Sequence, residues 1–308
     1  MSELDPLVPE RFQRFRRLPV TRDQVMLLLA ATGELALGGE TYLAHSMSGT
    51  IVPREWIPIV FGFVAGGTLL VAGVIALRHR TAATLLATVT LVLSIGVGLL
   101  GAYFHLVRAA VPGAVPGQRL TIDLLVWAPP VMGPLVFSLI GLLGVSAAWP
   151  EDRPDSGVLF LLGDRTLRLP YSKTRAYLLM VAVGILAALI SSVLDHARTG
   201  FTSVWVWVPT IVAVFGVVSA VTLAALAHPT RADLATFVVA MALLLVIGPV
   251  GSVLHAQQNL VAGSTVVLER FLRGPPALAP LLYSNMGLLG LAVLVAPERA
   301  STRSAIAA

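Results

Sequence analysis

Long apolar runs separated by short polar segments make up most of the chain. A membrane-spanning helix needs about 20 mostly apolar residues, and eight segments meet that requirement. They predict transmembrane helices near 24–45, 57–77, 82–106, 124–147, 174–196, 205–226, 233–255 and 277–296. The pattern therefore predicts an all-α polytopic membrane protein, with the lipid bilayer as its first partner.

The chain also matches itself when it is shifted by about 150 residues. Because each half holds four predicted spans, an even number, both halves have the same orientation and form a parallel internal repeat. The predicted units are a four-helix repeat over 1–150, a cytoplasmic linker over 151–172 and a second four-helix repeat over 173–308. The matches at an offset of 151 are Arg22 with Lys173, His45 with His196, Gly49 with Gly200, Trp56 with Trp207, Pro58 with Pro209 and Pro129 with Pro280, and those at 150 are Gly101 with Gly251 and His105 with His255.

Within the linker, two short apolar runs flank Gly163-Asp164. Runs of this length around a Gly-Asp turn are typical of a small β-hairpin.

Composition and charge support a membrane protein and indicate its orientation. Hydrophobic residues make up 56% of the chain and charged residues 12%, against about 25% charged in soluble domains. Fifteen of the 21 basic residues fall on the side of the N-terminus and six on the other side. Cytoplasmic loops carry the excess of basic residues, which predicts a cell-membrane protein with both termini in the cytoplasm.

Several kinds of chemistry are excluded by what the sequence lacks. The chain has no cysteine, so disulfides, iron–sulfur clusters and thiolate metal sites are ruled out. It shows no phosphate-binding loop, nucleotide-binding fold or basic nucleic-acid surface, and nucleic acid is therefore not an expected partner.

Four of the six histidines share one place in the predicted topology, at the outer end of an odd-numbered helix. An ionisable side chain at that depth is costly unless it has a partner, and is by default a functional candidate. Without thiolates, imidazole favours iron, copper or zinc. The predicted metal ligands are His45, His105, His196 and His255, whereas His79 and His228, at inner ends, are interpreted as interface residues.

Two arrangements of the four ligands remain open at this point. In the first, His45 pairs with His105 and His196 pairs with His255, and each half holds one haem b between two helices. In the second, all four converge on the central axis around one or two copper or zinc ions. In that arrangement Asp195, Glu40 and Gln257 are candidates for further metal ligands or for residues that orient the histidines.

Charged residues near the histidines have predicted roles of their own. Arg54, Arg108 and Arg198 are expected to bind the anionic groups of the cofactor, and Glu34 and Glu40 to handle protons. Glu34 precedes His45 by eleven residues, which places it on nearly the same helix face about 16 Å deeper in the membrane. Ile185 occupies the equivalent position of the second half, so the two halves differ chemically.

In outline the chain is similar to the haem A synthases, which have eight spans, two four-helix halves and a histidine pair near the outer face of each half. That family carries a glutamate shortly before a His-Arg pair and usually a cysteine pair in an outer loop. Here Ser46 follows His45, Ala197 follows His196, and cysteine is absent. The resemblance therefore implies an architecture and not a reaction.

The sequence favours a histidine-ligated redox protein that transfers electrons or oxidises a lipophilic substrate such as a quinol. Two other classes remain open. One is a transporter or permease for a metal or small solute, with its substrate between the halves. The other is a structural anchor whose partners are the remaining subunits of a larger membrane complex. The sequence leaves open whether the protein is an enzyme.

Overall fold

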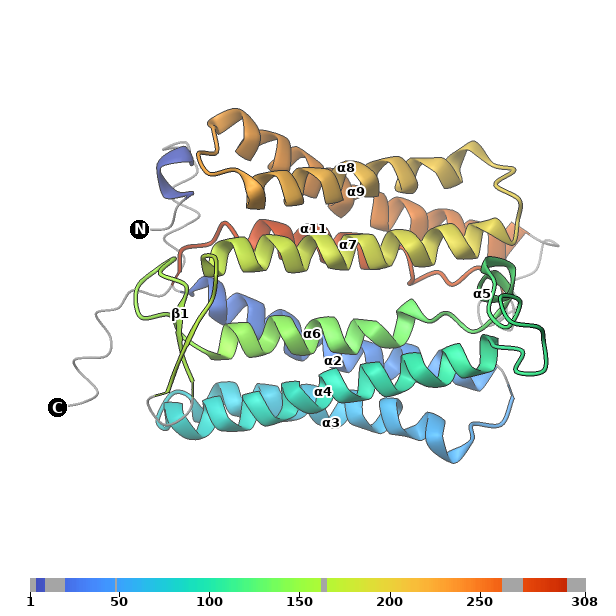
Figure 1. The fold of residues 1–308 in the computed structure, drawn as a ribbon, viewed down its shortest axis with the longest axis horizontal. Coiled ribbons are helices and arrows are strands. Elements are labelled where there is room, and N and C mark those ends of the chain that lie inside the picture. The colour runs from blue at the N-terminus through green and yellow to red at the C-terminus, as the bar shows by residue number, and fades with distance from the viewer. Residues whose placement is uncertain (1–3, 9–19, 48, 162–164, 262–273, 298–308) are drawn as a thin grey trace.

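The apolar runs fold into helices that lie side by side along one long axis (Figure 1). The structure is a computed structural model and describes residues 4–8, 20–47, 49–161, 165–261 and 274–297. The α-helices are α2 (Arg22–Met47), α3 (Trp56–Ile75), α4 (Arg80–Ala109), α5 (Ile122–Trp127), α6 (Met132–Ala148), α7 (Lys173–Ala197), α8 (Trp207–Ala225), α9 (Arg231–Val261) and α11 (Leu281–Ala292), and the short 3-10 helices are η1 (Asp5–Leu7), η3 (Pro53–Glu55) and η5 (Val204–Val206).

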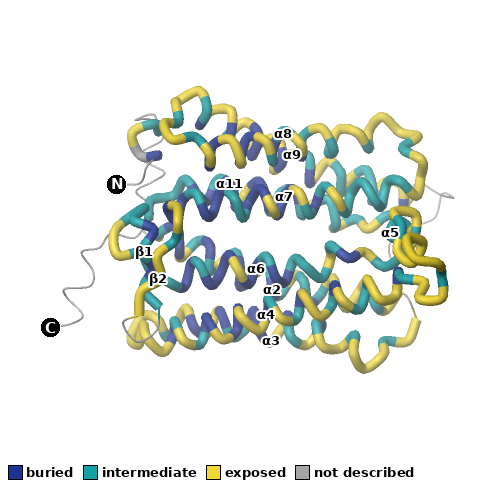
Figure 2. The backbone as a smooth tube through the Cα atoms, viewed as in Figure 1, coloured by how far each residue is buried: buried dark blue, intermediate teal, exposed yellow. Residues whose placement is uncertain are grey.

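Several of these helices have the length and apolarity needed to cross a membrane. Within the described residues, five qualify: Pro53–Ile75, Arg80–Ala109, Lys173–Ala197, Val204–Ala225 and Arg231–Leu260. The helices carry large exposed apolar side chains such as Val74 and Ile211, and exposed positions recur along the outer helices in Figure 2. A soluble protein would bury such surface, so the fold is that of an all-α, multi-pass membrane protein.

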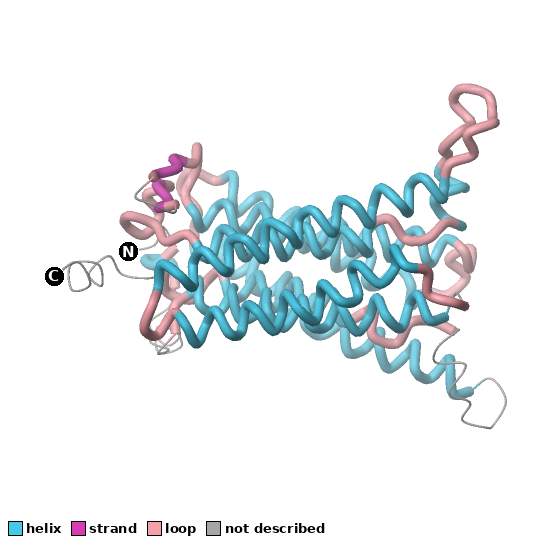
Figure 3. The backbone as a smooth tube through the Cα atoms, turned by 90° about the horizontal axis from the view of Figure 1, so that it is seen from below, coloured by secondary structure: helices cyan, strands magenta, loops and turns pink. Residues whose placement is uncertain are grey.

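The helices form two groups that meet along the middle of the bundle. In the first group α2 packs on α3 and α4 on α6, and in the second α7 packs on α8 and α9 on α11. Between the groups, α6 contacts α7 and α2 contacts α11. Loops gather at the two ends (Figure 3). The end that carries β1 is called the linker end below, and the end that carries α5 the histidine end.

The predicted span at 124–147 is wrong as a continuous helix. Helix α5 ends at Trp127 and α6 begins at Met132, with Pro129 and Pro130 between them. Proline lacks an N–H donor and disfavours helical backbone at the residue before it, and Ala128 is accordingly extended with ψ 170°. Helix α5 is therefore a separate short helix at the histidine end.

The predicted hairpin in the linker is confirmed. Strand β1 (Val158–Phe160) pairs antiparallel with β2 (Thr166–Arg168), with Val158 opposite Arg168. The Gly163-Asp164 turn lies outside the described residues.

Close helix contacts correct one of the sequence matches. A Cβ atom on Gly101 would lie 2.7 Å from Cβ of Pro134, and one on Gly251 would lie 2.8 Å from Cβ of Pro280. Pro280 therefore makes the contact that Pro134 makes in the first half, and its match with Pro129 was wrong. Pro280 follows His255 by four fewer residues than Pro134 follows His105, which accounts for the changed offset.

Gly141 offers a test of this close packing. A Cβ atom there would lie 2.5 Å from the carbonyl oxygen of Leu91 on the neighbouring helix. We expect Gly141→Ala to lower the free energy of unfolding by about 1–3 kcal/mol, because overpacking forces the helices apart. Gly96→Ala is the matched control, since no atom lies within 4 Å of the added methyl group. Equal stability of the two variants in detergent unfolding would show that the helices are less closely packed.

Candidate functional site

The four histidines form two separate pairs at the histidine end. The imidazole centroids of His45 on α2 and His105 on α4 are 6.3 Å apart, with an angle of 62° between the rings. Those of His196 on α7 and His255 on α9 are 6.2 Å apart, with an angle of 75°. Two pairs far apart in sequence thus have almost the same geometry, one in each helix group.

This spacing suits one metal ion held between two imidazoles. A bond from an imidazole nitrogen to a metal ion is about 2.0–2.1 Å long, so two imidazole nitrogens on opposite sides of one ion are about 4 Å apart. The ring centres lie farther from the ion than these nitrogens, and centroid distances of 6.3 and 6.2 Å are compatible with such a pair. The angle between the rings is free in this arrangement, because each ring can rotate about its own nitrogen–metal bond.

Backbone carbonyl groups orient both rings of the first pair. Nδ1 of His45 lies 2.9 Å from the carbonyl oxygen of Thr41, and Nδ1 of His105 lies 2.9 Å from that of Pro130. A carbonyl oxygen only accepts, so each Nδ1 carries the proton and donates it. The lone pair is then on Nε2, the usual state of an imidazole that ligates a metal.

The second pair is oriented in a similar but not identical way. Nδ1 of His255 lies 2.9 Å from the carbonyl oxygen of Pro276. Nδ1 of His196 instead lies 3.2 Å from the hydroxyl oxygen of Ser192. Asn259, which is buried, donates from Nδ2 to the carbonyl oxygen of Pro275 at 2.9 Å and fixes the same loop.

The orienting prolines were missed by sequence reasoning, although a signal for them was present. Each half contains a Pro-Pro pair, at 129–130 and 275–276, after the helix that carries the second histidine. In both pairs the carbonyl of the second proline accepts from that histidine. The recurrence of Pro-Pro would have identified these residues.

Both pairs line one large cavity at the histidine end, of about 2060 Å³. Ligand sites in proteins usually measure about 300–1,000 Å³, so the cavity has room for more than one flat ligand. Glu40, Arg54 and Arg108 also line it. The walls are mostly apolar, with residues such as Phe137 and Leu254 among them.

The three predicted arginines are in different situations. Arg54 lies with its guanidinium carbon 5.6 Å from the ring centre of Phe104, and Arg108 follows His105 by one helical turn. Arg198 donates from Nε to the carbonyl oxygen of Val126 at 2.6 Å and from a terminal nitrogen to that of Ala128 at 3.0 Å. Arg198 therefore joins α7 to the end of α5, which engages two of its donors.

The part of the chain that the structure describes contains no group of three or more histidine, aspartate or glutamate side chains placed to hold a metal ion. The four histidines lie in two pairs, and the arrangement in which all four converge on copper or zinc ions is not observed. Asp195 has an oxygen 3.7 Å from a guanidinium nitrogen of Arg198. Zinc sites in proteins usually have four ligands, whereas a haem iron needs only axial ligands from the chain.

The two predicted acids are separated by the fold. Glu40 lines the cavity, but Glu34 is fully buried away from it, between α2, α4 and α6. Ser94 Oγ lies 2.5 Å from Oε1 of Glu34 and 2.9 Å from the carbonyl oxygen of Phe137. The Ser94 hydroxyl is directed toward both acceptors and so links α2, α4 and α6 around the Glu34 carboxyl group.

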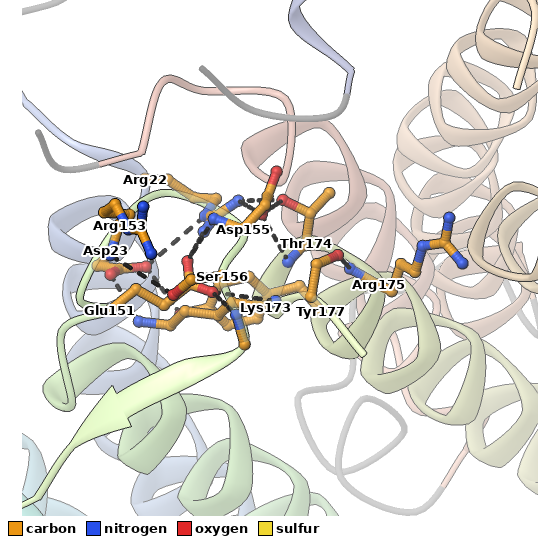
Figure 4. Close-up of polar contacts among 12 residues, drawn as sticks. Arg22, Asp23, Glu151, Arg153, Asp155, Ser156, Lys173, Thr174, Arg175 and Tyr177 are labelled. Carbon is orange, nitrogen blue, oxygen red and sulfur yellow. Dashed lines mark hydrogen bonds and ion pairs between the residues drawn. The ribbon is translucent and has the colours of Figure 1, made fainter. Parts of the chain in front are cut away.

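The linker end holds a buried charged cluster that joins the two helix groups (Figure 4). Lys173 Nζ on α7 donates to Asp23 Oδ2 on α2 at 2.7 Å and to the carbonyl oxygen of Trp149 at 2.8 Å. The Tyr177 hydroxyl donates to Asp23 Oδ1 at 2.9 Å. The side chains of Arg22 and Lys173 are each 1% exposed, so water does not screen these contacts.

The linker itself completes the cluster. Arg22 donates to the Thr174 hydroxyl at 2.6 Å, and its guanidinium lies 3.9 Å from carboxylate oxygens of both Glu151 and Asp155. Burial raises the pKa of the Glu151 carboxyl, an effect opposed by hydrogen bonds from the backbone N–H groups of Gly157 and Asp155. Sequence reasoning noticed Arg22 and Lys173 only as a repeat match, and their contacts were not predicted.

The fold and its two histidine pairs define a helical membrane protein with two similar candidate ligand sites. No protein-family model, curated protein or solved structure matches the chain. The function is therefore inferred from the geometry of this chain alone.

Proposed function

We propose that the protein is a membrane electron carrier that binds two haem b groups, one between His45 and His105 and one between His196 and His255. The observation that carries this proposal is the 6.2–6.3 Å spacing of the two ring pairs. Arg54 and Arg108 are placed along the cavity to bind the haem propionates.

The ligand set favours electron transfer over oxygen chemistry. Two imidazoles at each site would hold a haem iron, and the group would supply one-electron transfer there. The protein supplies the apolar cavity and fixes the orientation of the imidazoles. A lipid-soluble reductant such as a quinol is the proposed electron source, with Glu40 on the cavity wall and buried Glu34 as proton-handling residues.

We further propose that the two helix groups are tandem repeats related by a pseudo-two-fold axis. Arg22 donates to Thr174, while Lys173 donates to Asp23. At the repeat offset of 151, Lys173 matches Arg22 and Thr174 matches Asp23. A two-fold axis produces such reciprocal contacts: when a residue of the first repeat contacts a residue of the second, the equivalent residue of the second repeat contacts the equivalent residue of the first.

In this proposal eight segments cross the cell membrane, with α2, α6 and α11 added to the five helices of clear spanning length. The arginine distribution supports a cytoplasmic location for both termini and the linker end. The histidine pairs then lie near the extracytoplasmic face, where their cofactors would meet a partner or substrate outside the cytoplasm.

Absorption spectroscopy of the purified protein tests the proposed function. We expect a Soret band that shifts on addition of dithionite, and two haem b groups per chain when the haem is extracted and quantified. Protein that was expressed with a full haem supply and shows neither a Soret band nor bound iron would contradict the proposal.

A further inference from the structure

The end of α5 is held by a side chain from the other helix group. Arg198, the residue after the end of α7, donates from Nε to the carbonyl oxygen of Val126 at 2.6 Å and from a terminal nitrogen to that of Ala128 at 3.0 Å. In a helix the Val126 carbonyl would accept from the N–H group three or four residues later. Those two residues are Pro129 and Pro130, and proline has no N–H. Arg198 therefore supplies a donor that α5 lacks.

The segment that Arg198 holds also carries the carbonyl group that orients His105. Pro130 is two residues after Ala128, and its carbonyl oxygen lies 2.9 Å from Nδ1 of His105. Each proline fixes its own φ, and Pro129 also restricts the backbone of Ala128. The segment is therefore stiff, and a side chain that holds Ala128 also sets the position of the Pro130 carbonyl.

Arg198 also contacts a carboxylate on its own helix. A terminal nitrogen lies 3.7 Å from Oδ1 of Asp195, and the two side chains are 36% and 45% exposed. Ion pairs with this exposure contribute little. The two contacts with α5 are shorter, and a planar guanidinium presents its donors in a fixed geometry that suits two acceptors. The contacts with α5 therefore determine what Arg198 does in the fold.

The loop that orients His255 is held in another way. Asn259 donates from Nδ2 to the carbonyl oxygen of Pro275 at 2.9 Å, and the next residue, Pro276, accepts from His255. Asn259 and His255 are about one helical turn apart on α9. This loop is therefore anchored by the helix that carries the histidine itself.

The sequence lacks each anchor at the matching position of the other half. Four residues after His105, Ala109 takes the place of Asn259. Met47 takes the place of Arg198 at the offset of 151. Neither of these side chains can donate a hydrogen bond. The two halves of the chain therefore anchor their Pro-Pro loops differently.

We propose that Arg198, a residue of the second half, is a positioning residue for the histidine pair of the first half. It holds the end of α5 so that the Pro130 carbonyl stays directed at Nδ1 of His105, which keeps the lone pair on Nε2. The first site thus depends on a side chain of the opposite half, whereas the second depends on Asn259 in its own helix. The consequence for a bound group rests on the proposed haem function.

NMR of the full-length protein without haem tests the positioning role. In protein labelled with ¹⁵N at histidine, the spectrum distinguishes a protonated Nδ1 from a protonated Nε2. The signals of His105 and His196 are those that His105→Gln and His196→Gln remove. We expect Arg198→Met, which copies Met47, to reduce the preference of His105 for a protonated Nδ1. The His196 signal should not change, although His196 is only two residues from Arg198.

Two further variants make the NMR result specific. Arg198→Lys keeps the charge but not the planar set of donors, and should reduce the preference of His105 less than Arg198→Met does. Arg119→Met is the matched control, because Arg119 donates to the carbonyl oxygen of Ala114 in its own loop at 3.1 Å. It should leave the His105 signal unchanged. A His105 signal that Arg198→Met does not affect, or that Arg119→Met affects equally, would overturn the inference.

Haem retention measures the consequence at each site. In the His255→Ala protein, which keeps the first pair, Arg198→Met should weaken haem retention by about 10-fold, the smaller effect expected for residues that orient a metal ligand. In the His105→Ala protein, which keeps the second pair, Arg198→Met should change nothing and Asn259→Ala should weaken retention. The reverse pattern, or equal losses at both sites, would overturn the inference. If the wild type bound no haem, the proposed function would fail, but an NMR change confined to His105 would still support the positioning role.

Discussion

Replacing His105 with alanine should reduce the haem content from two groups to one per chain. The variant removes one of the two imidazoles 6.3 Å apart in the first pair and leaves the second pair intact. The site would then offer one imidazole in place of two, and the haem would be held less firmly. His255→Ala should give the same loss at the other site, and His105→Ala/His255→Ala should lose both groups. Haem extraction and the amplitude of the Soret band measure the result.

The same series separates paired sites from one shared centre. If each single histidine variant lost all bound haem or metal, the four residues would serve one site, contrary to the pairs seen here. His79→Ala and His228→Ala are matched controls, because both histidines lie outside the cavity lining and beyond the spanning helices. Full haem content in His105→Ala, in His255→Ala and in the double variant would refute the ligand assignment.

Lys173→Met should destabilise the folded protein by about 3–5 kcal/mol, the usual effect of removing one partner from a buried ion pair. Nζ of Lys173 donates a hydrogen bond of 2.7 Å to Oδ2 of Asp23, and the Asp23 side chain is only 9% exposed. Without the ammonium group the buried carboxylate keeps only the Tyr177 hydroxyl and the more distant Arg22 guanidinium, 3.7 Å away, as partners. Unfolding by denaturant in detergent micelles measures the loss.

Two further variants make this result interpretable. Asp23→Asn/Lys173→Met removes both charges and should recover part of the lost stability, because no uncompensated charge remains. Arg153→Ala removes a cation whose side chain is 79% exposed next to Asp152, and surface pairs of this kind contribute little. A Lys173→Met protein as stable as Arg153→Ala would show that the cluster does not hold the two helix groups together.

The positions of most helices could be predicted from the sequence, because apolar run length decides where a helix can cross a lipid bilayer. The exception at 128–131 was decided by Pro129-Pro130, whose effect depends on local backbone geometry and not on hydropathy. The match of Pro280 with Pro129 failed for a related reason. Residue identity aligned the two prolines, whereas packing against Gly251 showed that Pro280 corresponds to Pro134.

The candidate site was predicted only in part. The match of the sequence with itself at an offset of about 150 residues was enough to single out the four histidines. Arg54 and Arg108 were suggested because they lie close to these histidines in the sequence. Which histidine faces which, and through which nitrogen, depends on helix neighbours and on carbonyl groups that residue spacing does not reveal. Glu34 was expected on nearly the same helix face as His45 and about 16 Å deeper, and its contact with Ser94 keeps it between helices and outside the cavity lining.

The sequence by itself determined that the chain is a helical membrane protein and which imidazoles can act as ligands, because hydropathy and residue type are local properties. Only the tertiary structure decided that these imidazoles stand in two pairs and that Arg22, Asp23 and Lys173 meet at the opposite end. Both decisions depend on how separate helices pack, since contacts between helices are fixed by shape and partner and not by order along the chain.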